Sequence, residues 1–118
     1  MRTLVALVLG CALASVVVGA QNPSDAKRGQ ELWMTYTCYG CHGYSGNGGN
    51  GPKLAQGGRF NNATALTNYV RNPPRANLMP SYSTKVLSDD QLAAIYAFLK
   101  SVPPSPPAKD IPLLSDFR

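Results

Sequence analysis

Three residues that could do chemistry together stand close to one another in the chain: Cys38, Cys41 and His42. Two thiols three positions apart lie on one side of a helical turn, where they could add to the two vinyl groups of one porphyrin. The histidine that follows directly would then lie beneath the ring, with an imidazole nitrogen aimed at the iron. The C-x-x-C-H pattern therefore predicts one covalently attached haem c, held by Cys38 and Cys41, with His42 as an axial ligand of the iron.

Other chemistries of these residues fit less well. A thioredoxin-type redox pair belongs in a βαβ setting, and no such pattern flanks the two cysteines. A structural zinc site needs four nitrogen or sulfur ligands, and the sequence supplies only three with no plausible fourth. A disulfide between Cys38 and Cys41 would leave His42, the only histidine of the chain, without a role.

The second axial position of such an iron has to be filled without another histidine. Met79 lies in a predicted loop and is followed by a proline, whereas Met34 precedes the first cysteine by only four residues, too few to reach the opposite face of the ring. Met79 is therefore favoured by elimination, with Lys53 and Lys85 as poorer substitutes. A thioether ligand favours ferrous iron, and two protein ligands leave no vacant position for a substrate. This predicts electron transfer rather than enzymatic chemistry.

Two helices are predicted around the first half of the site. One runs over residues 25–36, after an N-cap at Ser24, and delivers the cysteines. The other runs over residues 63–71, after an N-cap at Asn62, and ends at two prolines. Asn62 also begins a formal glycosylation sequon, but the helix cap is the favoured interpretation. The glycine-rich loop between them lacks the strand and helix that a phosphate cradle needs, and we expect its glycines to let the backbone pass close to a flat cofactor.

A third helix follows the Met79 loop. Ser88 with Gln91 three residues later forms a capping box, and apolar residues then recur at helical spacing up to Leu99. The sequence shows no internal repeat and no strand-like alternation. The predicted fold class is all-α.

The first twenty residues have the pattern of a secretory signal. Arg2 is followed by an apolar stretch from Leu4 to Val18 and by a small-residue cleavage site that ends at Ala20. We therefore expect cleavage after Ala20 and a periplasmic location. A retained leader or lipidation of Cys11 are the alternatives, and only these would tie the protein to a membrane.

The charge of the chain excludes some partners. Its formal net charge is +5, which becomes +4 when Arg2 leaves with the leader, and the basic residues are scattered. A nucleic-acid partner is therefore not implied. A mildly basic surface suits a redox protein with an acidic docking face.

The end of the chain, residues 103–118, is a proline-rich tail that should be extended, partly as polyproline II. We expect four of its apolar residues to pack back onto the body: Ile111, Leu113, Leu114 and Phe117. The alternative is a docking arm for a partner.

These features in this order resemble the class I c-type cytochromes, the soluble monohaem cytochromes c of bacteria, over Ser24 to Val102. The matching elements are Gly29 and Trp33, Cys38-Tyr39-Gly40-Cys41-His42-Gly43, Gly51-Pro52-Lys53-Leu54, Met79-Pro80, and the C-terminal helix with Tyr96. The resemblance implies three to four helices around one haem in residues 21–102. It also implies a helix crossing between Gly29 and Tyr96, although Gly29 precedes Cys38 by nine residues, one more than is usual.

The resemblance assigns further site residues. The carbonyl of Pro52 would accept the second imidazole N–H of His42 and make this ligand more basic. Met79 would be the second axial ligand. From the residues themselves, four aromatic side chains are expected to line the cofactor: Trp33, Tyr69, Tyr82 and Phe98. Three arginines are candidates for propionate contact, although a solvated surface position is the commoner state for each: Arg59, Arg71 and Arg75.

The implied function is that of a periplasmic carrier that passes one electron between redox proteins, with no small-molecule substrate. A haem subunit permanently bound to a periplasmic dehydrogenase is the alternative. A haem peroxidase or gas-binding sensor is a third possibility, which requires that Met79 does not hold the iron firmly.

Overall fold

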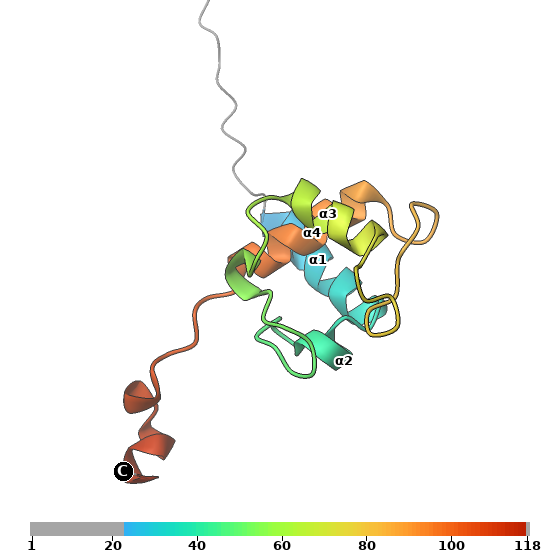
Figure 1. The fold of residues 1–118 in the computed structure, drawn as a ribbon. Coiled ribbons are helices and arrows are strands. Elements are labelled where there is room, and N and C mark those ends of the chain that lie inside the picture. The colour runs from blue at the N-terminus through green and yellow to red at the C-terminus, as the bar shows by residue number, and fades with distance from the viewer. Residues whose placement is uncertain (1–22, 118) are drawn as a thin grey trace, which may run out of the picture.

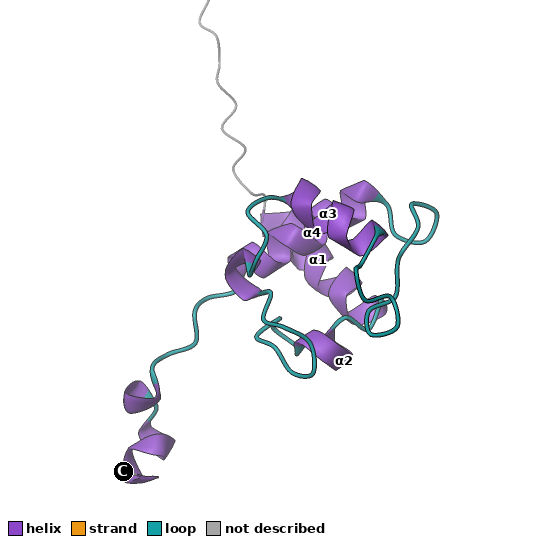
Figure 2. Cartoon of the chain, viewed as in Figure 1, coloured by secondary structure: helices purple, strands orange, loops and turns teal. Residues whose placement is uncertain are grey.

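The computed structural model describes residues 23–117, and within this range it contains four α-helices and no strand (Figures 1 and 2). The helices are α1 (Pro23–Thr35), α2 (Tyr39–His42), α3 (Ala63–Arg71) and α4 (Asp89–Ser101). Short 3₁₀ turns form η1 (Ala55–Gly57), η2 (Ala108–Asp110) and η3 (Pro112–Phe117). The all-α class is confirmed. The leader, its cleavage site and Cys11 lie outside the described residues.

The crossing of α1 and α4 is the main contact of the fold. At its closest point, a Cβ added to Gly29 would lie 1.9 Å from the carbonyl oxygen of Ala94 and 2.9 Å from Cβ of Phe98. Residues 94 and 98 share one face of α4 because they are one helical turn apart. The expected Gly29–Tyr96 crossing is therefore wrong in its partner. Tyr96 donates a hydrogen bond from its hydroxyl to the Phe60 carbonyl at 3.3 Å instead.

The core lies between α1, α3 and α4. Its buried members come from the apolar faces of these helices and from two connecting segments: Trp33, Leu54, Leu66, Val70, Leu87, Leu92, Ile95, Tyr96, Phe98 and Leu99. The helix α4 supplies half of them, because it packs against α1, α3 and η1 at once. The core therefore surrounds α4, while α2 lies to one side of it (Figure 1).

Helix caps fix where these elements begin. The Asn62 side chain accepts a hydrogen bond from the Ala65 amide at 2.8 Å, and Ser88 and Gln91 make both bonds of the capping box. These two predicted caps are confirmed. The predicted cap at Ser24 is wrong, because α1 already begins at Pro23. Proline suits the first turn of a helix, where an N–H would have no partner within the helix.

The tail leaves the body after α4 (Figure 1). The side chain of Gln56 donates to the carbonyls of Val102 at 2.9 Å and Pro103 at 3.1 Å, which holds the root of the tail. Beyond it, the prolines prevent a continued helix. Leu113 is 82 % exposed and Leu114 is also exposed, so the expectation that these two leucines pack onto the body is wrong.

No helix within residues 23–117 combines the length and the apolar character needed to span a bilayer.

Candidate haem site

The C-x-x-C-H motif forms α2 and the turn that precedes it. The His42 amide donates to the Cys38 carbonyl at 3.0 Å, so both cysteines and the histidine lie within one helical turn. Cys38 and Cys41 are free thiols that are not joined by a disulfide, and Cys41 is exposed. Burial raises the pKa of the Cys38 thiol from 9.0 to about 11. Neither sulfur is held in a disulfide, so both can form a bond to a cofactor.

His42 is held in a defined orientation. Its side chain is buried, and Nδ1 lies 2.8 Å from the carbonyl oxygen of Pro52. Because a carbonyl can only accept, Nδ1 carries the proton and donates, which leaves Nε2 with a free lone pair. Among the described residues, no buried side-chain nitrogen or oxygen lacks a partner. The unpaired Nε2 is therefore not sealed in the core and can reach a ligand.

The loop after α2 brings Pro52 to the imidazole. The Gly48 amide donates to the His42 carbonyl and the Gly51 amide donates to the Cys41 carbonyl, both at 2.8 Å. A Cβ on Gly51 would lie 2.8 Å from both Nδ1 and Cε1 of His42, closer than real Cβ atoms approach. The glycine-rich loop therefore folds back onto α2, and glycine is required where the backbone passes the ring.

Trp33 supports His42 from α1. The two ring centroids are 6.0 Å apart and tilted by 50°, and Nε1 of Trp33 donates to the Gly43 carbonyl at 3.1 Å. Phe98 packs against the indole at 6.0 Å. Trp33 thus links the core to the residue that follows His42. The sequence pointed to Trp33 as a neighbour of the cofactor, but no signal in it predicted the hydrogen bond.

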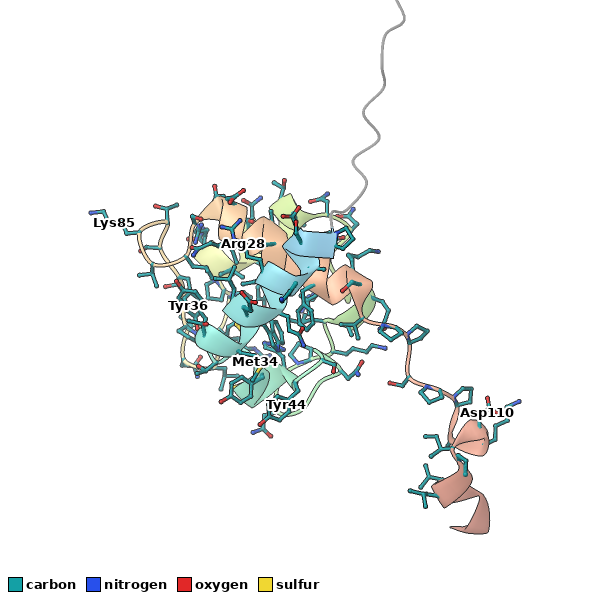
Figure 3. All side chains as sticks on the ribbon, turned by 180° about the vertical axis from the view of Figure 1, so that it is seen from behind. Arg28, Met34, Tyr36, Tyr44, Lys85 and Asp110 are labelled. Carbon is teal, nitrogen blue, oxygen red and sulfur yellow. The ribbon has the colours of Figure 1, made fainter. Side chains whose placement is uncertain are left out.

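The loop between α3 and α4 carries Met79. Its backbone amide donates to the Arg75 carbonyl at 3.0 Å, and its half-buried side chain packs against the core. In Figure 1 this loop (yellow) and the glycine-rich loop (green) lie on opposite sides of the view, with α2 between them at the lower edge of the body. Met34 is 39 % exposed and lies on the outer surface beside Tyr44 (Figure 3). Of the two methionines within residues 23–117, Met79 is the one that packs against the core.

Tyr82 relates the Met79 loop to the cysteines. Burial raises the pKa of Tyr82, and negative charge on Cys38 and Cys41 raises it further. Tyr82, Met79 and Cys38 all pack against the same core cluster. Tyr82 also meets Tyr36, the residue directly after α1, edge-on, with ring centroids 6.1 Å apart. The loop that carries Met79 therefore lies close to the residues that would hold a haem.

A protein-family model described as cytochrome c oxidase, cbb3-type, subunit III matches residues 24–99. The chain belongs to this family of class I c-type cytochrome domains. No curated protein and no solved structure matches the chain. The match covers all four α-helices almost completely, and the family resemblance is thereby confirmed. As a cytochrome c domain, the chain has a haem-based role in electron transfer, with haem c as cofactor and redox proteins as partners.

The donor atoms of this cytochrome fit an iron porphyrin. Within residues 23–117, no three side chains of His, Cys, Asp or Glu gather where they could hold a metal ion by themselves. The described residues offer two free thiols, one oriented imidazole and one thioether on a neighbouring loop, a set that fits a covalently held haem with His and Met ligands.

The arginines expected near the propionates make contacts within the protein. The Arg71 guanidinium bonds the Tyr82 carbonyl at 2.7 Å and pairs with Asp89, and its contact with a propionate stays a prediction. Arg59 lies over the ring of Tyr69, 5.5 Å from its centroid, and Tyr69 in turn packs against Phe60. Tyr69 thus contacts both Phe60 and Arg59, and its place beside the cofactor stays a prediction. Arg75 is exposed.

Proposed function

We propose that this protein is a periplasmic electron carrier with one haem c, bound through Cys38 and Cys41 and ligated by His42 and Met79. The observation that carries the proposal is the 2.8 Å contact between Nδ1 of His42 and the Pro52 carbonyl. This bond fixes the tautomer and the orientation of the ring, and directs Nε2 toward the cofactor.

The chain's own residues have distinct tasks in this proposal. Cys38 and Cys41 hold the cofactor at the edge of α2, and His42 with its Pro52 partner supplies a rigid ligand. When bound, the haem iron supplies one-electron exchange between its ferrous and ferric states. Met79 would supply a soft ligand to the iron and would keep that ligand position closed to substrates. Two ligands that persist in both oxidation states keep rearrangement small, so we infer a carrier and not an enzyme.

The compartment and the partners follow from the sequence. The leader over residues 1–20 would direct export, with cleavage after Ala20. The mature chain, at a formal charge of +4 before the cofactor is counted, would dock on an acidic face of its donor and acceptor proteins. Electrostatic steering of this kind increases the rate of encounter more than the affinity, which suits a carrier that has to leave again.

A second candidate is a haem subunit that stays bound to a larger enzyme such as a periplasmic dehydrogenase. The matched family is described as a subunit of an oxidase, and the exposed tail offers a segment for permanent docking. Size-exclusion chromatography of a native extract distinguishes the two: a carrier elutes alone, and a subunit elutes with its enzyme.

Acid–acetone extraction tests covalent attachment. The haem of the exported protein should remain with the protein, and the double variant Cys38→Ser/Cys41→Ser should lose it. Cys11→Ser is the matched control and should retain the haem. Release of haem from the unaltered protein would exclude the proposal. Rapid carbon monoxide binding by the native protein would instead favour a sensor or peroxidase.

A further inference from the structure

We propose that Arg71 is a positioning residue for Met79: it ties the Met79 loop to α3 and α4 and so controls how firmly the thioether stays at the iron. The inference rests on the proposed ligation by Met79. It is distinct from that ligation because Arg71 acts through the backbone of the loop and not on the cofactor.

Arg71 is the last residue of α3, and its side chain is only 15 % exposed. Its Nη1 donates to the Tyr82 carbonyl at 2.7 Å, and its Nη2 pairs with a carboxylate oxygen of Asp89 in the first turn of α4. The planar guanidinium presents several donors in a fixed fork, so one side chain can join two segments at once. Arg71 therefore joins α3, the Met79 loop and α4.

The bond to Tyr82 fixes the loop close to Met79, which lies three residues earlier. The Tyr82 amide also donates to the Val70 carbonyl at 3.2 Å. Two adjacent residues of α3 thus hold both polar groups of the Tyr82 backbone. On the other side of Met79, a turn closes from the Arg75 carbonyl to the Met79 amide. The methionine lies between two fixed points, and Arg71 supplies the charge-assisted bond at one of them.

The outer part of the same loop is held differently. The Tyr36 hydroxyl donates to the Val86 carbonyl at 2.6 Å, at an exposed position, and Lys85 points away from the body (Figure 3). Water competes for exposed hydrogen bonds, so this contact restrains the loop less than a half-buried, charged donor does. We therefore expect removal of the Arg71 side-chain bonds to loosen Met79 more than any other single change in the loop's supports.

The chain contains a matched control for this arginine. Arg28 of α1 pairs with Asp90 at 2.9 Å, so it also joins a helix to the first turn of α4. Its side chain and that of Asp90 are 48 % and 79 % exposed, and the hydrogen bond of the pair runs between α1 and α4 rather than to the Met79 loop. Arg28→Met removes a comparable ion pair from the same turn of α4 and leaves the loop untouched.

The experiment compares holoproteins with Arg71→Met, Arg71→Lys, Asp89→Asn and Arg28→Met. Three quantities are measured: the rate at which imidazole binds the ferric protein, the absorption band of thioether bound to ferric iron, and the reduction potential. In Arg71→Met we expect imidazole to bind at least about tenfold faster, as loss of one charge-assisted hydrogen bond predicts. The thioether band should weaken and the potential should fall. Arg71→Lys should restore part of the loss, Asp89→Asn should be intermediate, and Arg28→Met should match the unaltered protein.

If Arg71→Met equals the unaltered protein in the imidazole binding rate, the thioether band and the reduction potential, the proposal is overturned. Equal effects of Arg71→Met and Arg28→Met overturn it as well, because they would show a general loosening of α4. If Arg71→Met does not form a holoprotein, the same three measurements on Arg71→Lys and Asp89→Asn test the proposal. Met79→Ala separates this proposal from the proposed function: if it leaves the thioether band in place, the ligation itself is wrong. If Met79→Ala removes the thioether band and the Arg71 variants change none of the three quantities, the ligation stands and only the positioning role is wrong.

Discussion

The backbone at Gly51 lies against the ring of His42, so close that a Cβ there would stand 2.8 Å from Nδ1 and Cε1. The next residue, Pro52, supplies the carbonyl that accepts a hydrogen bond from the Nδ1–H of His42. The shape of the glycine-rich loop and the orientation of the imidazole therefore depend on each other. Addition of one methyl group at this point should therefore change the reduction potential of the iron.

Gly51→Ala should push the ring and the Pro52 carbonyl apart. A weaker bond to Nδ1 makes the imidazole less basic, so the reduction potential should rise. Overpacking should also lower the stability by about 1–3 kcal/mol. Potentiometric titration and thermal unfolding of the holoprotein measure both effects. Gly40→Ala is the control within the cysteine motif, since a Cβ there meets nothing within 4 Å. If Gly51→Ala and Gly40→Ala had the same reduction potential and the same stability, the close contact between Gly51 and the His42 ring would be contradicted.

Met79→Ala should convert the carrier into a protein that binds external ligands. With no second histidine in the chain, the sixth position would pass to water or to a displaced lysine. The potential should fall, because the ligand that favours ferrous iron has gone and water enters the pocket. Cyanide or carbon monoxide should bind faster, which stopped-flow absorbance measures.

Met34→Leu is the control for the methionine prediction. Met34 is partly exposed on α1, and a volume-conserving swap usually costs less than about 1.5 kcal/mol. Its spectrum and potential should equal those of the unaltered protein. A shift in Met34→Leu without one in Met79→Ala would show that the distal ligand is misassigned.

Local signals in the sequence were sufficient for most of the fold. The caps at Asn62 and Ser88 are bonds between residues three apart, so neighbouring residue types reveal them. The motif of Cys38, Cys41 and His42 is equally local. Ligation by His42 and Met79 stays a prediction, although the Pro52 contact that the family resemblance implied is present.

Relationships between distant segments could not be read from the sequence. Arg71 reaches Tyr82 and Asp89, eleven and eighteen residues away, and no pattern distinguishes such an arginine from a solvated one. The partner of Gly29 depends on the rotation of α4 about its axis, which apolar spacing fixes only to within a residue or two. The tail was expected to pack because Leu113 and Leu114 are apolar. The prolines before them direct the chain away, and an apolar residue alone does not fix its partner.

The leader makes a separate prediction about the compartment. Deletion of residues 1–20 should give apoprotein, because the chain would not reach the haem-attachment machinery. Intact-mass analysis of the exported protein should show a chain that begins at Gln21 and carries one haem. A lipid-modified Cys11 as the observed N-terminus would contradict cleavage after Ala20 and would tie the protein to a membrane.

Among the glycines of residues 23–117 that lie outside the site, Gly29 should be the one at which replacement by alanine destabilises the protein most. The new Cβ would meet the Ala94 carbonyl at 1.9 Å, and a backbone group of α4 cannot move aside as a flexible side chain could. The two helices would have to separate, which also disturbs Trp33, one turn further along α1, and the His42 ring that it supports. We expect a loss at the upper end of the overpacking range, about 3 kcal/mol or more, in chemical unfolding of the holoprotein. Gln30→Ala, at an exposed neighbouring position, is the control and should change the stability by less than about 0.7 kcal/mol. A Gly29→Ala variant as stable as Gln30→Ala would mean that α1 and α4 do not cross at Gly29.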